Sequence, residues 1–414
     1  MLLFFIVLFA AGLLPTLSQK YAQDMLPALL GDAVEYDEIY IDPFKGVATF
    51  TNLRIKQPAD FGPGNFLDTP KATIHFPRMA LLRGEVNIAS LDLKSPVFLF
   101  VRNRTGAINV GTWPDSPSIT LWRMARVTAT DAQAFYMDEI SDDSTLEVVA
   151  SGAFIKAFDL KLSNKLPFSH SIEELHIYVP QTLLRKTGRQ LRTDTPDHPF
   201  EIGKIVFHSD ILTYEDDNVQ PRPLDLGFTN VHVVAEGLIL GNTQTREVVT
   251  SKVEMTGDLV QSDQSALCGI FGKIGPMEGR DTLIRADLHA VGLQLNSVAT
   301  LFQAETNMLR EARVALGGSQ FDLHHDFKGK LKEMRIKMHT SSPRGINTES
   351  TIIFGDLEDR TADHWRHFKN ALISPDKVTA TPSIQNRDPH AMARDWSENV
   401  VKRAATLFKN ARMR

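Results

Sequence analysis

The sequence contains a single cysteine, Cys268, among its 414 residues. An intrachain disulfide is therefore impossible, which excludes the small secreted folds that depend on disulfide cross-links. Cys268 stands in an apolar run, residues 266–270, so we expect it to be a small buried hydrophobic side chain. An excess of positive charge is also missing, because 45 Lys and Arg residues against 50 Asp and Glu residues give a net charge of −5. We therefore expect no nucleic acid partner.

Common catalytic motifs are missing as well. The sequence has no Gly-x-Ser-x-Gly, no P-loop and no Gly-x-Gly-x-x-Gly. Two histidine pairs resemble metal ligands: His324 with His325, flanked by aspartates, and His364 with His367. Neither pair has a third ligand at a diagnostic spacing, so we expect surface or capping roles, no metal and no cofactor. An enzyme such as a hydrolase would need His324 or His364 beside carboxylates in a cleft.

An uncharged segment opens the chain. Residues 2–14, if helical, would span about 20 Å, which is short of the roughly 30 Å hydrocarbon core of a bilayer. The length suits a signal peptide, but the segment lacks an initial Lys or Arg and a good cleavage site. We interpret residues 1–18 as a transmembrane anchor or an uncleaved signal, and a cleaved signal remains open. The expected membrane contacts are Leu2, Phe4, Phe5, Ile6, Leu8, Phe9, Leu13 and Leu14.

Periodicity changes after this segment. Residues 19–33 predict a short amphipathic helix, because Tyr21, Met25 and Leu29 recur at four-residue spacing and Gly31 suits a C-terminal cap. From Val34 onward, apolar and polar residues alternate with the period of two that is typical of strands. Strand predictions are 47–56, 72–76, 86–93, 97–101, 147–162, 172–179, 202–207, 228–235, 248–259, 283–291, 328–338 and 348–354. We expect about seventeen to nineteen strands in all, with helical insertions near 181–191 and 294–312.

A weak internal repeat crosses the strand region. When Leu91, Val127 and Val206 are set in register, each strand leads through a small polar turn into a second apolar strand. We interpret it as a recurring hairpin-like unit, although any two hairpins share this much similarity. The aligned positions are Ser95, Asp131 and Asp210 in the turn, then Leu99, Phe135 and Tyr214.

Several ordered motifs resemble those of AsmA-like proteins. They are the run from Asp42 to Ile55, with Pro43, Phe44 and Gly46 in its turn; residues 58–62; the run from Val86 to Val97; and Gly106-Ala107-Ile108-Asn109. The resemblance covers residues 1 to about 110, and residues 202–240 look like a later unit of the same family. It implies a long curved antiparallel β-groove with an apolar concave face, related to bridge-like lipid-transfer proteins.

The resemblance also implies a place and a role. AsmA-like proteins sit in the bacterial inner membrane on a single-pass anchor, with the body in the periplasm, and support envelope lipid homeostasis. The domain expectation is an AsmA-like β-groove over 34–358 and a helical region over 359–414. The partners implied are membrane lipids, with phospholipid favoured.

A groove of this kind needs no catalytic residue, because alternate residues of a strand face opposite sides of the sheet and one face can shelter acyl chains. For every candidate groove residue, ordinary core packing is the alternative. A structural or interaction scaffold with a filled core is the rival function. The candidates are Phe50, Phe76, Phe98, Phe100, Phe135, Tyr214 and Phe228.

The end of the chain differs in character. Trp396, Val400, Leu407 and Phe408 lie on one stripe of an expected helix, followed by a basic terminus. Such a helix can dock to an envelope protein partner, lie on an anionic membrane surface, or cap the end of the sheet.

Overall fold

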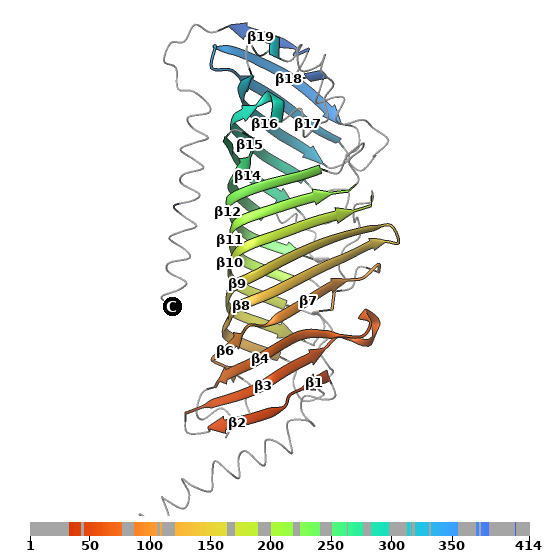
Figure 1. The fold of residues 1–414 in the computed structure, drawn as a ribbon, viewed down its shortest axis with the longest axis vertical. Helices are drawn as coiled ribbons and strands as arrows, with labels where there is room; N and C mark the ends of the chain where they lie inside the picture. Colours follow the sequence, from red (N-terminus) through yellow and green to blue (C-terminus); the bar gives the residue numbers. More distant parts are fainter. Residues whose placement is uncertain are drawn as a thin grey trace, which may run out of the picture. The chain divides into compact units, whose positions relative to one another are not determined.

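The structure is a computed structural model of the whole chain. It describes residues 33–42, 45–76, 87–105, 108–109, 121–163, 170–188, 200–217, 224–240, 251–262, 264–275, 283–297, 313–314, 316, 319–330, 333–354, 370–371, 374–380 and 402. These residues are mainly strand. Strands β1 to β19 belong to one large mixed sheet (Figure 1). The β-rich body that the period of two predicts is therefore confirmed.

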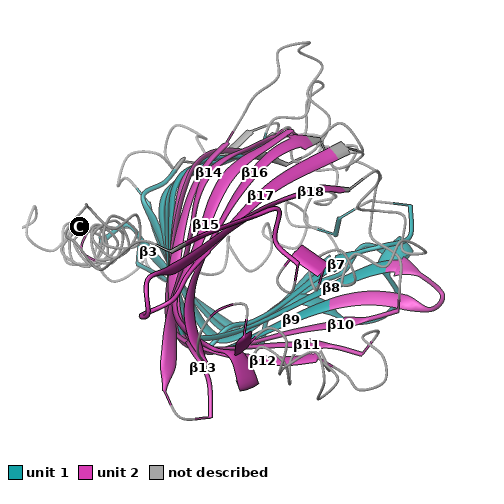
Figure 2. Cartoon of the chain, turned by 90° about the horizontal axis from the view of Figure 1, so that it is seen from above, with its two compact units in different colours: residues 1–139, 147–179, 196–203 teal, residues 140–146, 180–195, 204–414 magenta. Residues whose placement is uncertain are grey.

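The chain divides into two compact units (Figure 2). Unit 1 holds residues 1–139, 147–179 and 196–203. Its elements, including the first part of β10, are β1 Val34–Glu35, β2 Glu38–Asp42, β3 Val47–Lys56, the 3-10 turn η2 Ala59–Phe61, β4 Asn65–His75, β5 Asn87–Ile88, β6 Ser90–Lys94, β7 Val97–Arg102, β8 Leu121–Ser141, β9 Ser144–Ser163 and β10 His170–Thr187.

Unit 1 mixes the two strand directions. β2, β3, β4 and β6 pair as antiparallel neighbours, whereas β5, β6 and β7 each pair with β8 in parallel. The sheet that we expected to be antiparallel is therefore mixed here. Parallel neighbours need a connection of a dozen or more residues, and residues 103–120 between β7 and β8 provide that length.

Unit 2 holds residues 140–146, 180–195 and 204–414. From β12 to β19, every strand pairs antiparallel with the next strand of the chain. Its strands, after the last part of β10, are β11 Phe200–Asp216, β12 Leu224–Leu240, β13 Ser251–Val260, β14 Ser265–Gly275, β15 Leu283–Gln294, β16 Gln320–Lys330, β17 Glu333–Ser341, β18 Ile346–Phe354 and β19 Lys377–Ala380.

Three expected elements differ from the structure. Residues 181–187 of the expected helix at 181–191 are strand, because Thr182 and Arg185 of β10 bind side chains of β11, and tertiary pairing overrides a weak helix propensity. The expected strand at 328–338 is two strands, β16 and β17, which meet as a hairpin. Residues 377–380, expected in a helical region, form β19 against β18.

Other expectations fall outside the described residues. These are the anchor or signal at 1–18, the helix at 19–32 and nearly all of the C-terminal region. Of the insertion at 294–312, residues 295–297 are helical and 298–312 lie outside. Within the described ranges, no helix is both long enough and apolar enough to cross a membrane.

Candidate functional site

The sheet of unit 2 separates apolar from polar side chains. Cross-strand register aligns Met255, Ile270, Leu288 and Met338 in one row over β13, β14, β15 and β17, with His325 between the last two. A second row, two residues along, contains Val253, Ala286, Phe327, Ile336 and Ile352. We call the side of β13–β18 that carries these rows the apolar face and the opposite side the polar face.

A hydrophobic core covers part of the apolar face. Met334, Met338 and Phe321 are almost fully buried, and Leu295, Leu316 and Ala371 from outside the strands join the same cluster. Phe228, a predicted groove residue, packs against this cluster and lies opposite Leu259 in the β12–β13 register. Phe228 therefore contacts protein side chains on the side where a lipid was expected.

The aromatic candidates of unit 1 divide between the two sides of its sheet. Phe50 is buried in a register row with Ile39, Ala72 and Leu93, and its ring meets Tyr36 edge-on. Phe98 and Phe100, two residues apart on β7, stack on each other with ring centroids 5.8 Å apart.

Phe135 does not share a side with that pair. It stands opposite Leu99 in the β7–β8 register, whereas Phe98 stands opposite Ala134. Because successive residues of a strand face opposite sides, Phe135 lies on the other side of the sheet, where it is 36% exposed. The prediction that these three rings line one surface is therefore wrong for Phe135.

Two further candidates have specific polar contacts. Phe76 follows β4, and its backbone N–H donates to the Gly46 carbonyl at 2.9 Å. Tyr214 donates its hydroxyl to the Asp216 carboxylate at 3.1 Å. The anchor residues from Leu2 to Leu14 lie outside the described residues.

Exposed cations form a row along one edge of unit 2. Lys252, Lys273, Arg285, Lys328 and Arg335 are consecutive register partners on β13 to β17, and all five are exposed. Each lies within two residues of the end of its strand, so the row follows that edge of the sheet. Lys252 is paired with the Glu254 carboxylate. Like charges directly opposite each other destabilise a sheet, so the rest of the row has an energetic cost that an anionic ligand would relieve. We call it the cationic row.

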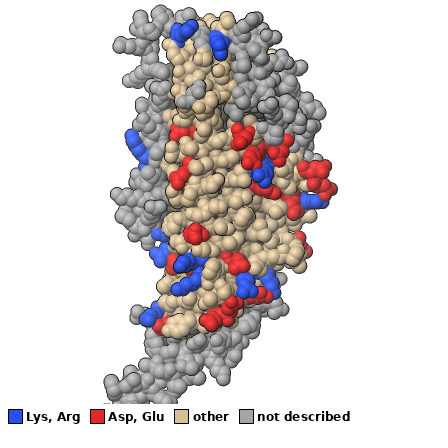
Figure 3. Space-filling view, in the orientation of Figure 1, with Lys and Arg blue, Asp and Glu red and all other residues tan. Residues whose placement is uncertain are grey.

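Unit 1 shows no comparable row among its described residues but has mixed charges. In β1 to β3, Arg54 contacts Asp37 at 2.9 Å and Glu35 at 3.8 Å, and Lys56 pairs with Glu35. The Lys56 hydrogen bond and charge lower the pKa of the Glu35 carboxyl. In Figure 3, acidic and basic side chains lie next to one another in the lower part of the visible face.

Aromatic rings stack across four strands of the polar face. Phe271 on β14, His289 on β15, His324 on β16 and His339 on β17 follow one another at centroid distances of 5.5, 4.3 and 5.6 Å. Gly269 is the register partner of His289, so no side chain opposite His289 blocks the Phe271 ring. His324 Nε2 lies 3.1 Å from Asp287 Oδ1.

Sequence reasoning missed the partners of His324. His289 lies directly opposite it, and Asp287 lies two residues before His289 on β15. The sequence has no third ligand at a diagnostic spacing from His324, but the structure places Asp287 and His289 beside it. His324 and Asp287 are 37 residues apart in the sequence. No short motif spans that distance, because strand register brings the two residues together. His364 and His367 lie outside the described residues.

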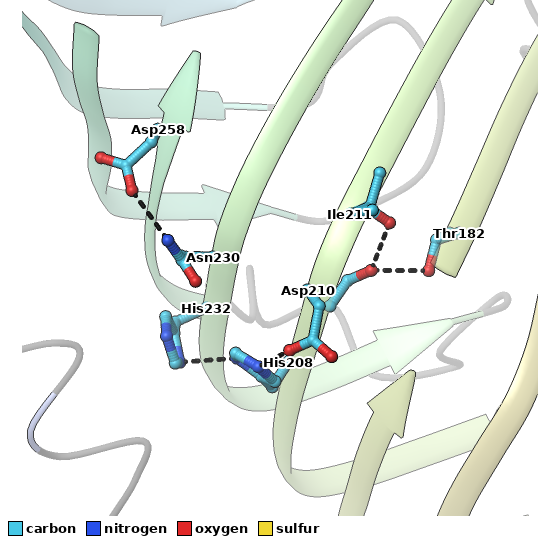
Figure 4. Close-up of polar contacts among 8 residues, drawn as sticks. Thr182, His208, Asp210, Ile211, Asn230, His232 and Asp258 are labelled. Carbon is cyan, nitrogen blue, oxygen red and sulfur yellow. Dashed lines mark hydrogen bonds and ion pairs between the residues drawn. The ribbon is translucent and has the colours of Figure 1, made fainter. Parts of the chain in front are cut away.

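A second polar cluster joins β10 to β13 (Figure 4). The Ser209 hydroxyl donates to the Ile211 carbonyl at 2.8 Å, so the Thr182 hydroxyl, 3.1 Å away, is the donor to Ser209. Asn230, which has a φ of 53°, donates to Asp258 at 3.1 Å and marks the shift in register between β12 and β13.

Two histidines of this cluster meet through their ring nitrogens. His208 Nε2 lies 2.8 Å from Asp210 Oδ1, and His208 Nδ1 lies 3.1 Å from His232 Nδ1. Burial, followed by the charge of His208, lowers the pKa of His232 to about 4. His232 is therefore neutral at neutral pH.

Burial also shifts the pKa values of two side chains on the apolar face, His325 and Cys268. It lowers the pKa of His325 to about 4, with smaller contributions from the charges of His324 and His339. It raises the pKa of the Cys268 thiol to about 12. Cys268 is half-buried and packs against the hydrophobic cluster, so the expected hydrophobic role is confirmed while the expected full burial is not.

Comparison with known proteins identifies no family and no relative for this chain. No family model, curated protein or solved structure matches this chain.

Proposed function

We propose that this chain is a non-catalytic, AsmA-like protein that binds or conveys phospholipid along the apolar side of its β-sheet. The apolar face of unit 2 is the observation that carries the proposal. Its rows run from β13 to β18 with interruptions at Gly272, His325 and Ser350, and five inter-strand steps of about 4.8 Å give them a length of about 24 Å.

Energetics favour an apolar ligand on such a face. Removing each CH₂ group from water contributes about 0.8 kcal/mol, so an acyl chain of about fifteen methylenes gains about 12 kcal/mol from complete shelter. The hydrophobic cluster covers only part of this face among the described residues of unit 2, because Met255, Ile270 and Leu288 are not members of it. Half-buried side chains such as Met255, Ile270 and Leu288 are available for ligand contact.

The cationic row supports phospholipid over neutral lipid. The row is adjacent in sequence to Ala286, Phe327 and Ile336 of the apolar face, so it projects from the polar face at the sheet edge. A phosphate at that edge would bind its Lys and Arg side chains while the acyl chains pass over the edge onto the apolar face. The location proposed with this function is a bacterial inner membrane, with the body in the periplasm.

A scaffold with a filled core is the second candidate function. The observation that favours it is the cluster of Phe321, Leu316 and Met338, whose side chains are at most 1% exposed and already fill part of the apolar face. In that case the face would be occupied by protein and would take up no lipid.

Native mass spectrometry of the full chain, purified from membranes in mild detergent, tests the proposal. We expect co-purifying phospholipid and uptake of fluorescent phospholipid. A matched pair of substitutions locates the contact: Ile270→Glu on the apolar face should reduce bound lipid, whereas Ile353→Glu on the polar face should not. Circular dichroism checks that both variants fold.

Absence of both bound phospholipid and uptake in the unsubstituted chain would contradict lipid binding and favour the scaffold. Equal lipid content in the two folded variants would place the ligand elsewhere.

A further inference from the structure

Three potential metal ligands converge on the polar face of unit 2. Asp287 and His289 lie two residues apart on β15, and His324 lies opposite His289 on β16. One carboxylate oxygen and two imidazole nitrogens from these side chains all lie within 4.8 Å of one another. The arrangement is independent of the apolar face, which lies on the other side of the same strands.

Sheet geometry explains why these residues meet. Residues two apart on a strand share a face, and directly opposed residues of antiparallel strands have Cβ atoms about 4.5–5.5 Å apart. Two positions on one strand and one on its neighbour therefore form a compact triangle. Because backbone hydrogen bonds fix the three positions, little main-chain order has to be created when a ligand binds.

The distances suit a small transition-metal ion. Zinc bonds of about 2.0–2.1 Å in a tetrahedral arrangement place neighbouring ligand atoms about 3.3 Å apart. His324 Nε2 and Asp287 Oδ1 are already 3.1 Å apart. The two imidazole rings are nearly parallel, with an angle of 5° between their planes, so they must tilt for their lone pairs to converge. Rotation about the terminal ring torsion is soft and permits this.

We propose that Asp287, His289 and His324 bind one divalent transition-metal ion, with Zn²⁺ as the expected occupant. Two nitrogen ligands and one carboxylate match Zn²⁺, whereas Mg²⁺ and Ca²⁺ prefer sites made of oxygen ligands. His289 is buried, while the side chains of His324 and Asp287 are 22% and 37% exposed. An ion can therefore enter from solvent, and water can complete its coordination.

Two further rings flank the three ligands. Phe271 stacks on His289 with 3° between the ring planes, and His339 stacks beyond His324 at 20°. His339 lies in the same row but is not one of the three convergent ligands. Binding would tie β15 to β16 through side chains in addition to their backbone hydrogen bonds.

Zinc titration of the metal-free full chain tests this site. The chain, purified in mild detergent and treated with a chelator, is titrated with Zn²⁺ against a chromogenic chelator. We expect saturable binding of one ion per chain at this site. Asp287→Asn, His289→Gln and His324→Gln should each weaken it at least about tenfold, since loss of even an outer-shell partner has an effect of this size. His339→Gln, the matched control, should bind like the unsubstituted chain.

Two measurements on the unsubstituted chain avoid dependence on folding of the variants. Co²⁺ in place of Zn²⁺ should give the intense visible bands of a four-coordinate site, and Zn²⁺ should slow amide hydrogen exchange in β15 and β16. Absence of saturable Zn²⁺ binding would overturn the proposal. Binding that survives in a folded His289→Gln or His324→Gln variant, or protection confined to other strands, would overturn it as well.

Discussion

Replacing His232 by glutamine should change how the stability of the protein depends on pH. His232 is 9% exposed and shares a hydrogen bond with His208, and the charges of Asp210 and Asp258 partly oppose the lowering of its pKa. Burial is the largest cause of its lowered pKa, and the positive charge of His208 adds to the effect. Glutamine keeps a polar group beside His208 but cannot take up a proton.

The size of the effect follows from the two protonation equilibria. The pKa of His232 falls from 6.5 to about 4 on folding. The unfolded chain therefore binds the proton first as the pH falls, so stability is complete above pH 6.5 and is lost as the pH drops toward 4. Linkage gives a loss of about 2 kcal/mol at pH 5 and about 3 kcal/mol at pH 4, relative to pH 8.

Urea unfolding at pH 7 and pH 5, followed by circular dichroism, measures this loss. Between these two values, the free energy of unfolding of the unsubstituted chain should fall by about 2 kcal/mol more than that of the His232→Gln variant. His75→Gln is the control, because its side chain is 45% exposed and lies in unit 1. Parallel pH profiles for the unsubstituted chain and His232→Gln would refute the assignment of a buried neutral imidazole.

Three other substitutions or modifications give separate checks. Gly272→Ala should destabilise the protein by about 1–3 kcal/mol in urea unfolding, because a Cβ there would lie 2.2 Å from the Arg285 carbonyl oxygen. Cys268 should react with maleimide at pH 8 only after unfolding, because burial raises the pKa of its thiol to about 12; rapid labelling of the folded chain would contradict this. Glutamate at both Arg285 and Lys328 should weaken binding to anionic phospholipid vesicles, and unchanged binding would remove the cationic row from the proposed lipid site.

Strand periodicity predicted the fold better than it predicted strand direction. The expected strand at 47–56 coincides with β3, because Pro43 and Gly46 before it and Pro58 after it mark both ends. The 36-residue offset between Leu91 and Val127 also had a structural meaning, since these residues are register partners. The interpretation as a hairpin-like unit was wrong, because Val127, Asp131 and Phe135 all belong to the single strand β8. Val206, Asp210 and Tyr214 likewise belong to the single strand β11, so the polar position is not a turn between two strands.

Local backbone chemistry explains why that repeat was visible. Ser95 and Asp131, which the repeat aligned, have φ values of 46° and 55° and are joined by a hydrogen bond from the Ser95 hydroxyl to the Asp131 carboxylate at 3.0 Å. Small polar residues tolerate this left-handed conformation better than apolar ones. The two neighbouring segments therefore leave the extended conformation at the same position along the sheet, and a small polar residue suits the left-handed conformation in each.

The candidate sites depended on information that a single strand does not contain. Phe50 and Phe98 were recognisable as apolar positions, but Phe135 required the register of β8 against β7 to reveal its side of the sheet. His289 carried no motif at all. Its proximity to His324 depends on the pairing of β15 with β16, and a shift of one residue would turn one histidine to the apolar face.

The two proposals for unit 2 can be separated experimentally because a single-layer sheet has two independent faces. Leu288 and His289 are consecutive residues of β15, yet one belongs to the apolar rows and the other to the metal ligands. Ile270→Glu should therefore reduce lipid content without changing Zn²⁺ affinity, and His289→Gln should do the reverse. Ile270 and His289 lie on paired strands, and neighbouring residues couple by about 0.5–3 kcal/mol, so the effects of the two substitutions on stability should add to within about 0.5 kcal/mol only if no strain passes between the faces. A larger deviation would mean that β14 and β15 transmit the state of one face to the other.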